Sequence, residues 1–118
     1  MELRVIETDE PLTHLVLIGR LDLAGVQQVE TKFLAYTVAR KRPALVDISG
    51  VDYLVSFAIR MLISAAKAMH ANSTRLALLN PQRQVEDTLR LANLQQLMII
   101  THDEAEARSQ LLSGLTRA

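Results

Sequence analysis

A chain of 118 residues is long enough for one domain that buries about two thirds of the surface of its unfolded chain. It contains no cysteine, which excludes thiol catalysis, thiolate metal sites and disulfides. Thirteen basic residues balance thirteen acidic ones, so the overall positive field that draws proteins to nucleic acids or anionic membranes is absent. No basic region followed by an apolar core opens the chain, and no apolar run reaches bilayer length. We expect one cytoplasmic domain over residues 1–118.

The first elements predicted are two strands that form a hairpin. Residues 3–8 and 14–21 are rich in aliphatic side chains, and Pro11 lies in the turn between them. Asp22 follows the second strand and is predicted to cap a helix that runs to about Arg40. One face of this helix carries the apolar side chains of Val26, Val29, Phe33 and Tyr36.

The middle of the chain holds its most informative segment. A compact apolar run after Pro43 predicts a strand that ends at the polar pair Ser49 and Gly50. A long apolar helix is predicted over residues 57–69, which contain neither glycine nor proline. Ser56 precedes this helix and is predicted to be its N-cap, because a serine oxygen there can accept a hydrogen bond from an unpaired backbone N–H.

The last third of the chain alternates two strands with two helices. The strand predicted over residues 76–79 is followed by Asn80 and Pro81, which would supply a cap and a first-turn proline. The strand predicted over residues 97–100 is followed by a Thr-x-x-Glu capping box at 101–104. The apolar faces carry Val85, Leu89 and Ala92 in the first helix and Ala107, Leu111, Leu112 and Leu115 in the second.

The order of these elements predicts the fold class. Two strands and a helix are followed by three strand–helix pairs, which calls for parallel strands with right-handed crossovers after an antiparallel hairpin. We therefore predict an α/β domain with a mixed, mostly parallel five-strand sheet and about four helices.

Ser56 is the one residue that the pattern singles out for function. The three histidines lack metal-ligand spacing, and the four glycines form no phosphate-binding loop, so we predict no catalytic residue, metal or cofactor, and no enzyme. A phosphate on Ser56 would lie where unpaired N–H groups and the positive end of the helix dipole favour negative charge.

Four passages resemble a known family. LIGRLD at 17–22 looks like a strand ending in Gly-Glu-Leu-Asp, and LVDISGV at 45–51 looks like a central strand and turn. VSFAI at 55–59 falls where the family has Asp-Ser-Ser-Gly-Leu, and LRLANL at 89–94 looks like a late helix and turn. In this order the chain resembles the STAS family, the sulfate-transporter and anti-sigma-factor-antagonist domain, over nearly its whole length.

The resemblance to the bacterial anti-sigma factor antagonist type implies a phosphorylation switch. In those proteins a kinase that is also an anti-sigma factor phosphorylates the first serine of Asp-Ser-Ser-Gly, and the unphosphorylated protein binds that factor. Ser56 takes the place of this serine, whereas Val55 replaces the family's acid. The resemblance implies a partner-binding surface made of Asp22, Val55, Ser56, Phe57, Ile59 and Arg60.

The expected partner is an anti-sigma factor or a serine kinase of the switch type, with a homodimer as a further assembly and neither nucleic acid nor membrane insertion. Two alternatives stay open. One is a STAS scaffold or assembly subunit of a signalling or transport complex, in which Ser56 is not phosphorylated. The other is a small ligand-binding or enzymatic α/β domain with its pocket near residues 49–56.

Overall fold

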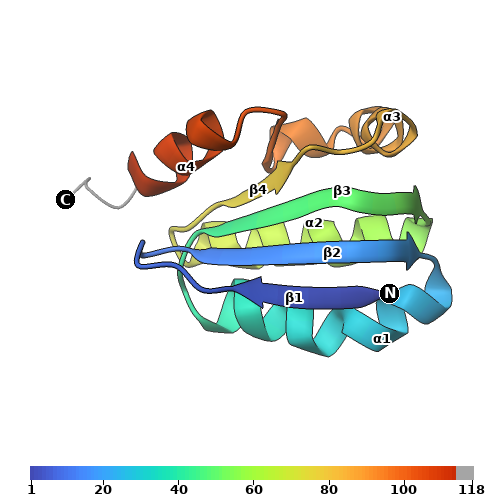
Figure 1. Ribbon diagram of the computed structural model, residues 1–118, viewed down its shortest axis with the longest axis horizontal. Coiled ribbons are helices and arrows are strands. Elements are labelled where there is room, and N and C mark those ends of the chain that lie inside the picture. Colours follow the sequence, from blue (N-terminus) through green and yellow to red (C-terminus); the bar gives the residue numbers. More distant parts are fainter. Residues whose placement is uncertain (114–118) are drawn as a thin grey trace.

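The computed structural model describes residues 1–113, in which five strands form one sheet with helices against both of its faces (Figure 1). In chain order the elements are β1 (Glu2–Ile6), β2 (Thr13–Leu21), α1 (Leu23–Leu34), the π-helix η1 (Ala35–Ala39), β3 (Ala44–Leu54), α2 (Ser56–Ala71), β4 (Leu76–Leu79), α3 (Arg83–Leu91), the 3-10 helix η2 (Leu94–Gln96), β5 (Ile99–Thr101) and α4 (Glu104–Ser113).

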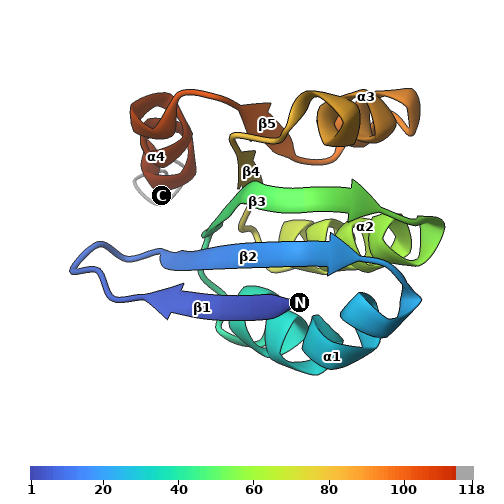
Figure 2. The same cartoon turned by 45° about the vertical axis from the view of Figure 1, so that its right-hand side comes forward.

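The sheet confirms the predicted fold class. Its strands follow the chain order from β1 to β5, with β1 antiparallel to β2 and every later pair parallel. The crossover helices between parallel strands therefore lie against the sheet faces, and the carboxyl ends of β2 and β3 meet at one edge (Figure 2).

Alternate side chains of the central strands build two apolar layers. Val46 of β3 and Leu78 of β4 join a large core with α1 and α2, whereas their neighbours Leu45 and Leu79 join a smaller core with α4. Helices α1 and α2 thus cover one face of the sheet and α4 covers the other (Figures 1 and 2). Phe33 of α1 is completely buried in the large core.

Strand β3 is longer than predicted. The strand was expected to end at Ser49 and Gly50, but it continues through a bulge at Ile48 and Ser49, and Gly50 pairs with Ile18 of β2. In the bulge the Asp47 carboxylate accepts a hydrogen bond from the Ser49 N–H at 2.9 Å. A second irregularity before Tyr53 lets β3 continue beside β2. A polar, glycine-containing pair is a turn signal in a sequence, but here the partner strand keeps the segment extended.

The helix predicted to run to about Arg40 is confirmed in extent, but its last part has a different hydrogen-bond pattern. Helix α1 ends at Leu34 and continues to Ala39 as the π-helix η1, where the buried Thr37 hydroxyl donates to the Phe33 carbonyl oxygen at 2.7 Å. The predicted capping box at 101–104 does not form, because Asp103 is the cap: its carboxylate accepts a hydrogen bond from the Glu106 N–H at 3.0 Å.

Helix α3 is also shifted from prediction. It begins after Gln82, so Asn80, with a φ of 56°, and Pro81 precede its cap. Ala92 follows the helix and is exposed, and β5 begins at Ile99 rather than at residue 97. Leu115, predicted on the face of the last helix, lies outside the described residues.

Two phenylalanines offer a matched test of the core. Replacing the buried Phe33 by alanine should lower the free energy of unfolding by about 3–5 kcal/mol through lost burial and a cavity. The same replacement of Phe57, which is 50% exposed, should cost less than about 1 kcal/mol. Urea titration followed by circular dichroism measures both, and equal losses would contradict this packing.

Candidate functional site

The start of α2 is fixed by the end of the preceding strand. Val55 is the N-cap, with extended backbone angles of φ −98° and ψ 170° and no side-chain cap bond. Its N–H donates to the Leu21 carbonyl oxygen at 3.1 Å, and its own carbonyl oxygen accepts from the N–H groups of Ala58 and Ile59 at 2.9 and 3.1 Å. The prediction that Ser56 is the N-cap was therefore wrong, because the β2–β3 pairing extends one residue further.

Ser56 is the first residue of α2, and its side chain is exposed. Within residues 1–113 neither its hydroxyl nor its backbone N–H has a hydrogen-bond partner, and the N–H of Phe57 also has none. Such unpaired N–H groups carry the positive end of the helix dipole. A negative group on the Ser56 oxygen would therefore meet two free donors.

Asp22 is brought beside this turn by the parallel pairing. In the sheet register Arg20 lies opposite Tyr53, and Leu21 lies opposite Leu54. The Asp22 carboxylate caps α1 by accepting a hydrogen bond from the Gly25 N–H at 2.8 Å. Gly25 is required there, since a Cβ would lie 2.1 Å from the Arg20 carbonyl oxygen.

The pKa of Asp22 is lowered by two neighbours. The Gly25 N–H hydrogen bond is the larger cause, and the guanidinium of Arg20, at 3.5 Å from the carboxylate, adds to it. Asp22 is thus held in its charged form by the helix that it caps. Its role in positioning α1 explains its place without any catalytic chemistry.

Exposed apolar side chains surround these strand ends. Leu23, Tyr53 and Phe57 are 48%, 42% and 50% exposed, an unusual exposure for large apolar residues. The Arg20 guanidinium lies 4.2 Å from the Tyr53 ring centre, and that of Arg60 lies 5.7 Å from the Phe57 ring centre. We call this region the strand-end surface, made of Arg20, Asp22, Leu23, Tyr53, Val55, Ser56, Phe57 and Arg60.

The structure thus brings together most of the residues that the sequence suggested. Asp22, Val55, Ser56, Phe57 and Arg60 lie at the strand ends, whereas Ile59 is half-buried and packs against the large core. Sequence reasoning missed Arg20, Leu23 and Tyr53. The sequence alternation of β3 could have indicated that Tyr53 is exposed only if the two irregularities of the strand had been known.

The three histidines lie on different parts of the fold: His14 on β2, His70 on α2 and His102 between β5 and α4. His14 of β2 lies 3.2 Å from a guanidinium nitrogen of Arg108, and burial lowers its pKa. His102 pairs with Glu86 at 2.7 Å. Among residues 1–113, no group of three His, Asp or Glu side chains could hold a metal ion, and no helix is long and apolar enough to cross a membrane.

Comparison with known proteins decides the family. The family model described as "Mlab, STAS domain" matches residues 6–101. The chain belongs to the STAS domain family. No curated protein matched it.

Solved structures share the same fold. A Thermotoga maritima protein proposed to be an anti-sigma factor antagonist superposes with a TM-score of 0.83 at 18% identity, over 93% of this chain and 94% of that one. The unphosphorylated anti-sigma factor antagonist SpoIIAA superposes with a TM-score of 0.76 at 18% identity, over 95% of this chain and 97% of that one. A STAS domain protein of Planctomyces limnophilus gives 0.75 at 22% identity, over 97% and 98%. A phosphorylated form of SpoIIAA, from Bacillus, gives 0.68 at 17% identity, over 92% and 98%.

The charge of Asp22 can be tested by pH. Asparagine caps helices about as well as aspartate, so Asp22→Asn removes only the charge. A lowered folded-state pKa stabilises the native state above the unfolded pKa of about 4, and this contribution is lost as the pH falls through the lower folded value. Wild type should therefore melt above Asp22→Asn at neutral pH, and the gap should close in acid.

Asp52→Asn is the control for this measurement, because the exposed Asp52 carboxylate accepts no hydrogen bond within residues 1–113. Its melting temperature should follow wild type at both pH values. A gap for Asp22→Asn that stays constant from neutral to acid pH would contradict the electrostatic explanation.

Proposed function

We propose that this STAS domain is an anti-sigma factor antagonist-like regulatory binding protein, without catalytic activity, that acts in the cytoplasm. It docks through the strand-end surface on an anti-sigma factor or a serine kinase of the switch type. Phosphorylation of Ser56 controls the docking. The general kind of function rests on the STAS family match, and the surface and its control are our inference from the geometry.

The observation that carries the proposal is the state of Ser56. Its hydroxyl is exposed and, among residues 1–113, free of hydrogen bonds, although serine at a helix start ordinarily caps the helix. Val55 occupies the cap position instead, so α2 does not need the Ser56 oxygen. A kinase could therefore modify this oxygen without breaking any contact within the described domain.

A phosphate there would change the character of the strand-end surface. It adds about −1.5 to −2 charges at neutral pH, and the free N–H groups of Ser56 and Phe57 would hold it in place. Arg60, one helical turn later, could pair with the phosphate and leave the Phe57 ring. A partner that fits Leu23, Tyr53 and Phe57 would then have to desolvate a charged group, which opposes binding.

The residue Val55 favours a second candidate function, that of a STAS scaffold or assembly subunit in which Ser56 is not phosphorylated. The family's switch serine follows an acid, which is absent here, so the kinase would lose a charged group by which to recognise its substrate. A STAS scaffold or assembly subunit would use the same exposed apolar side chains as a permanent interface. Phosphosite mapping of the protein from its native cells distinguishes the two, since a scaffold predicts unmodified Ser56.

Two substitutions of Ser56 separate the switch from the scaffold. Ser56→Asp should weaken binding to the anti-sigma factors of the source organism by about tenfold or more, because a carboxylate must be desolvated at the interface. Ser56→Ala should bind nearly as wild type, since no cap bond is lost. Isothermal titration calorimetry measures both affinities.

Ser109→Asp is the matched control, because Ser109 is an exposed serine on α4, which covers the opposite face of the sheet. It should leave binding unchanged. Thermal melts should show Ser56→Asp at least as stable as Ser56→Ala, since an acid in the first turn gains about 0.3–1 kcal/mol from the dipole. Wild-type affinity in Ser56→Asp would contradict the switch and leave the scaffold.

A further inference from the structure

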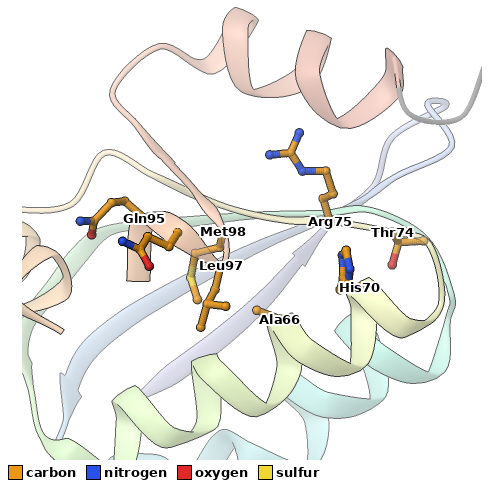
Figure 3. Close-up of a pocket in the computed structure, with 8 residues that line it drawn as sticks. Ala66, His70, Thr74, Arg75, Gln95, Leu97 and Met98 are labelled. Carbon is orange, nitrogen blue, oxygen red and sulfur yellow. The ribbon is translucent and has the colours of Figure 1, made fainter. Parts of the chain in front are cut away.

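A groove lies at the opposite end of α2 from Ser56. It has a volume of about 300 Å³, and α2 forms its floor where Ala66 faces the segment that leads into β5. Figure 3 shows His70, Thr74 and Arg75 on one side and Gln95, Leu97 and Met98 on the other. An adjoining cavity of about 340 Å³ shares Ala66, His70, Gln96 and Leu97 and adds Lys67. Both volumes are within the range of small-molecule sites.

The short edge strand leaves this groove open. Strand β5 has three residues and pairs with β4 only from Ala77 to Leu79. Among residues 1–113, Arg75 and Leu76 therefore have no strand beside them on the β5 side of β4. The preceding η2 turn is closed by a hydrogen bond from the Met98 N–H to the Leu94 carbonyl oxygen at 3.0 Å. This turn holds Leu97 beside α2 and forms the far wall of the groove.

The polar side chains at the groove and the adjoining cavity include two cations, Lys67 and Arg75, and their side chains are unpaired within residues 1–113. His70 and Arg75 line the groove, and Lys67 lines the adjoining cavity. Within residues 1–113 none of these three side chains has a hydrogen bond or an ion pair. The amide groups of Gln95 and Gln96 are also without partners there. No acidic residue belongs to either lining, so the groove offers several donors and no charged acceptor.

The negative end of the α2 dipole does not cancel this positive charge. The carbonyl oxygens of the last turn already accept hydrogen bonds, with Asn72 donating to Ala68 at 3.1 Å and Ser73 donating to His70 at 3.0 Å. The Met69 carbonyl oxygen accepts from both the N–H and the hydroxyl of Thr74, at 2.9 and 3.1 Å. Satisfied carbonyl groups compete weakly for the cations.

The groove also has an apolar wall. Leu97 is 44% exposed at its rim, which is a large exposure for a leucine, and the nearly buried Met98 side chain lies beside it. A ligand that fills the groove would therefore combine an anionic group with an apolar part. An arginine fork matches a phosphate through paired hydrogen bonds, and a lysine adds a point charge.

We propose that this groove binds a small organic phosphate, a phosphate monoester whose terminal oxygens contact His70 and Arg75 and whose organic part lies on Leu97 and Met98. Lys67 of the adjoining cavity adds a positive charge nearby. The site is separate from the strand-end surface. Ser56 and His70 are fourteen positions apart on one helix, which corresponds to about 21 Å. Failure of this proposal therefore leaves the proposed role of Ser56 unchanged, and the reverse also holds.

Phenyl phosphate is the probe for this site. Titrated into isotopically labelled protein, it should shift the backbone amide signals of Ala66, His70 and Leu97 in a saturable way, with a Kd of about 1 mM or lower. Arg75→Gln should raise that Kd about tenfold, because it removes a charge-assisted hydrogen bond, and Lys67→Gln about threefold, because it removes a nearby positive charge. Inorganic phosphate should bind more weakly than phenyl phosphate, since it cannot contact the apolar wall.

Matched control variants are available on other helices. Lys32 of α1 and Arg83 of α3 are exposed cations whose side chains lack partners within residues 1–113, so Lys32→Gln and Arg83→Gln should leave the Kd unchanged. Four results would overturn the proposal. The first is that no saturable shift occurs up to about 10 mM probe, and the second is that Arg75→Gln and wild type have equal Kd values. The third is that sodium chloride of equal ionic strength causes the same shifts. The fourth is that a tetraglutamate peptide binds whereas phenyl phosphate does not.

Discussion

The hydrogen bond from the Val55 N–H to the Leu21 carbonyl oxygen completes the pairing of β2 with β3. Because the two strands are parallel, both chains leave the sheet at the same edge, and each enters a helix within two residues. The cap of α1, Asp22, and the first residue of α2, Ser56, are neighbours for this reason. The exposed side chains of Leu23, Tyr53 and Phe57 follow from the same geometry, since each lies within three residues of a strand end.

Capping by Val55 separates the stability of α2 from the chemistry of Ser56. A serine that caps its helix uses its oxygen in a structural hydrogen bond, so a modification of that oxygen acts directly on the cap. Here the backbone makes the first turn alone, through the bonds that the Val55 carbonyl oxygen accepts from Ala58 and Ile59. The hydroxyl can therefore change its charge while the fold stays intact.

The fold could be predicted almost completely from the sequence, because apolar periodicity and helix signals are local. The strand Leu76–Leu79 has the predicted bounds in the structure. Asp22 caps α1, as an aspartate directly before a helix predicts. The errors arose where a distant segment decides the local structure. The pairing with β2 keeps Ser49 and Gly50 in a strand, and the same pairing moves the cap from Ser56 to Val55. Tyr53 was missed for this reason, since its exposure depends on two irregularities that only the register shows.

Those two irregularities also restrict how this segment can change in length. Side chains of a strand alternate between faces, so one extra residue in β3 inverts the alternation and a second restores it. Deleting a single residue between Asp47 and Tyr53 would move the side chains at the end of β3 to the opposite face of the sheet. Deleting two residues, one at each irregularity, would leave each side chain on its present face. Variants of this part of β3 that still fold should therefore differ in length by an even number of residues.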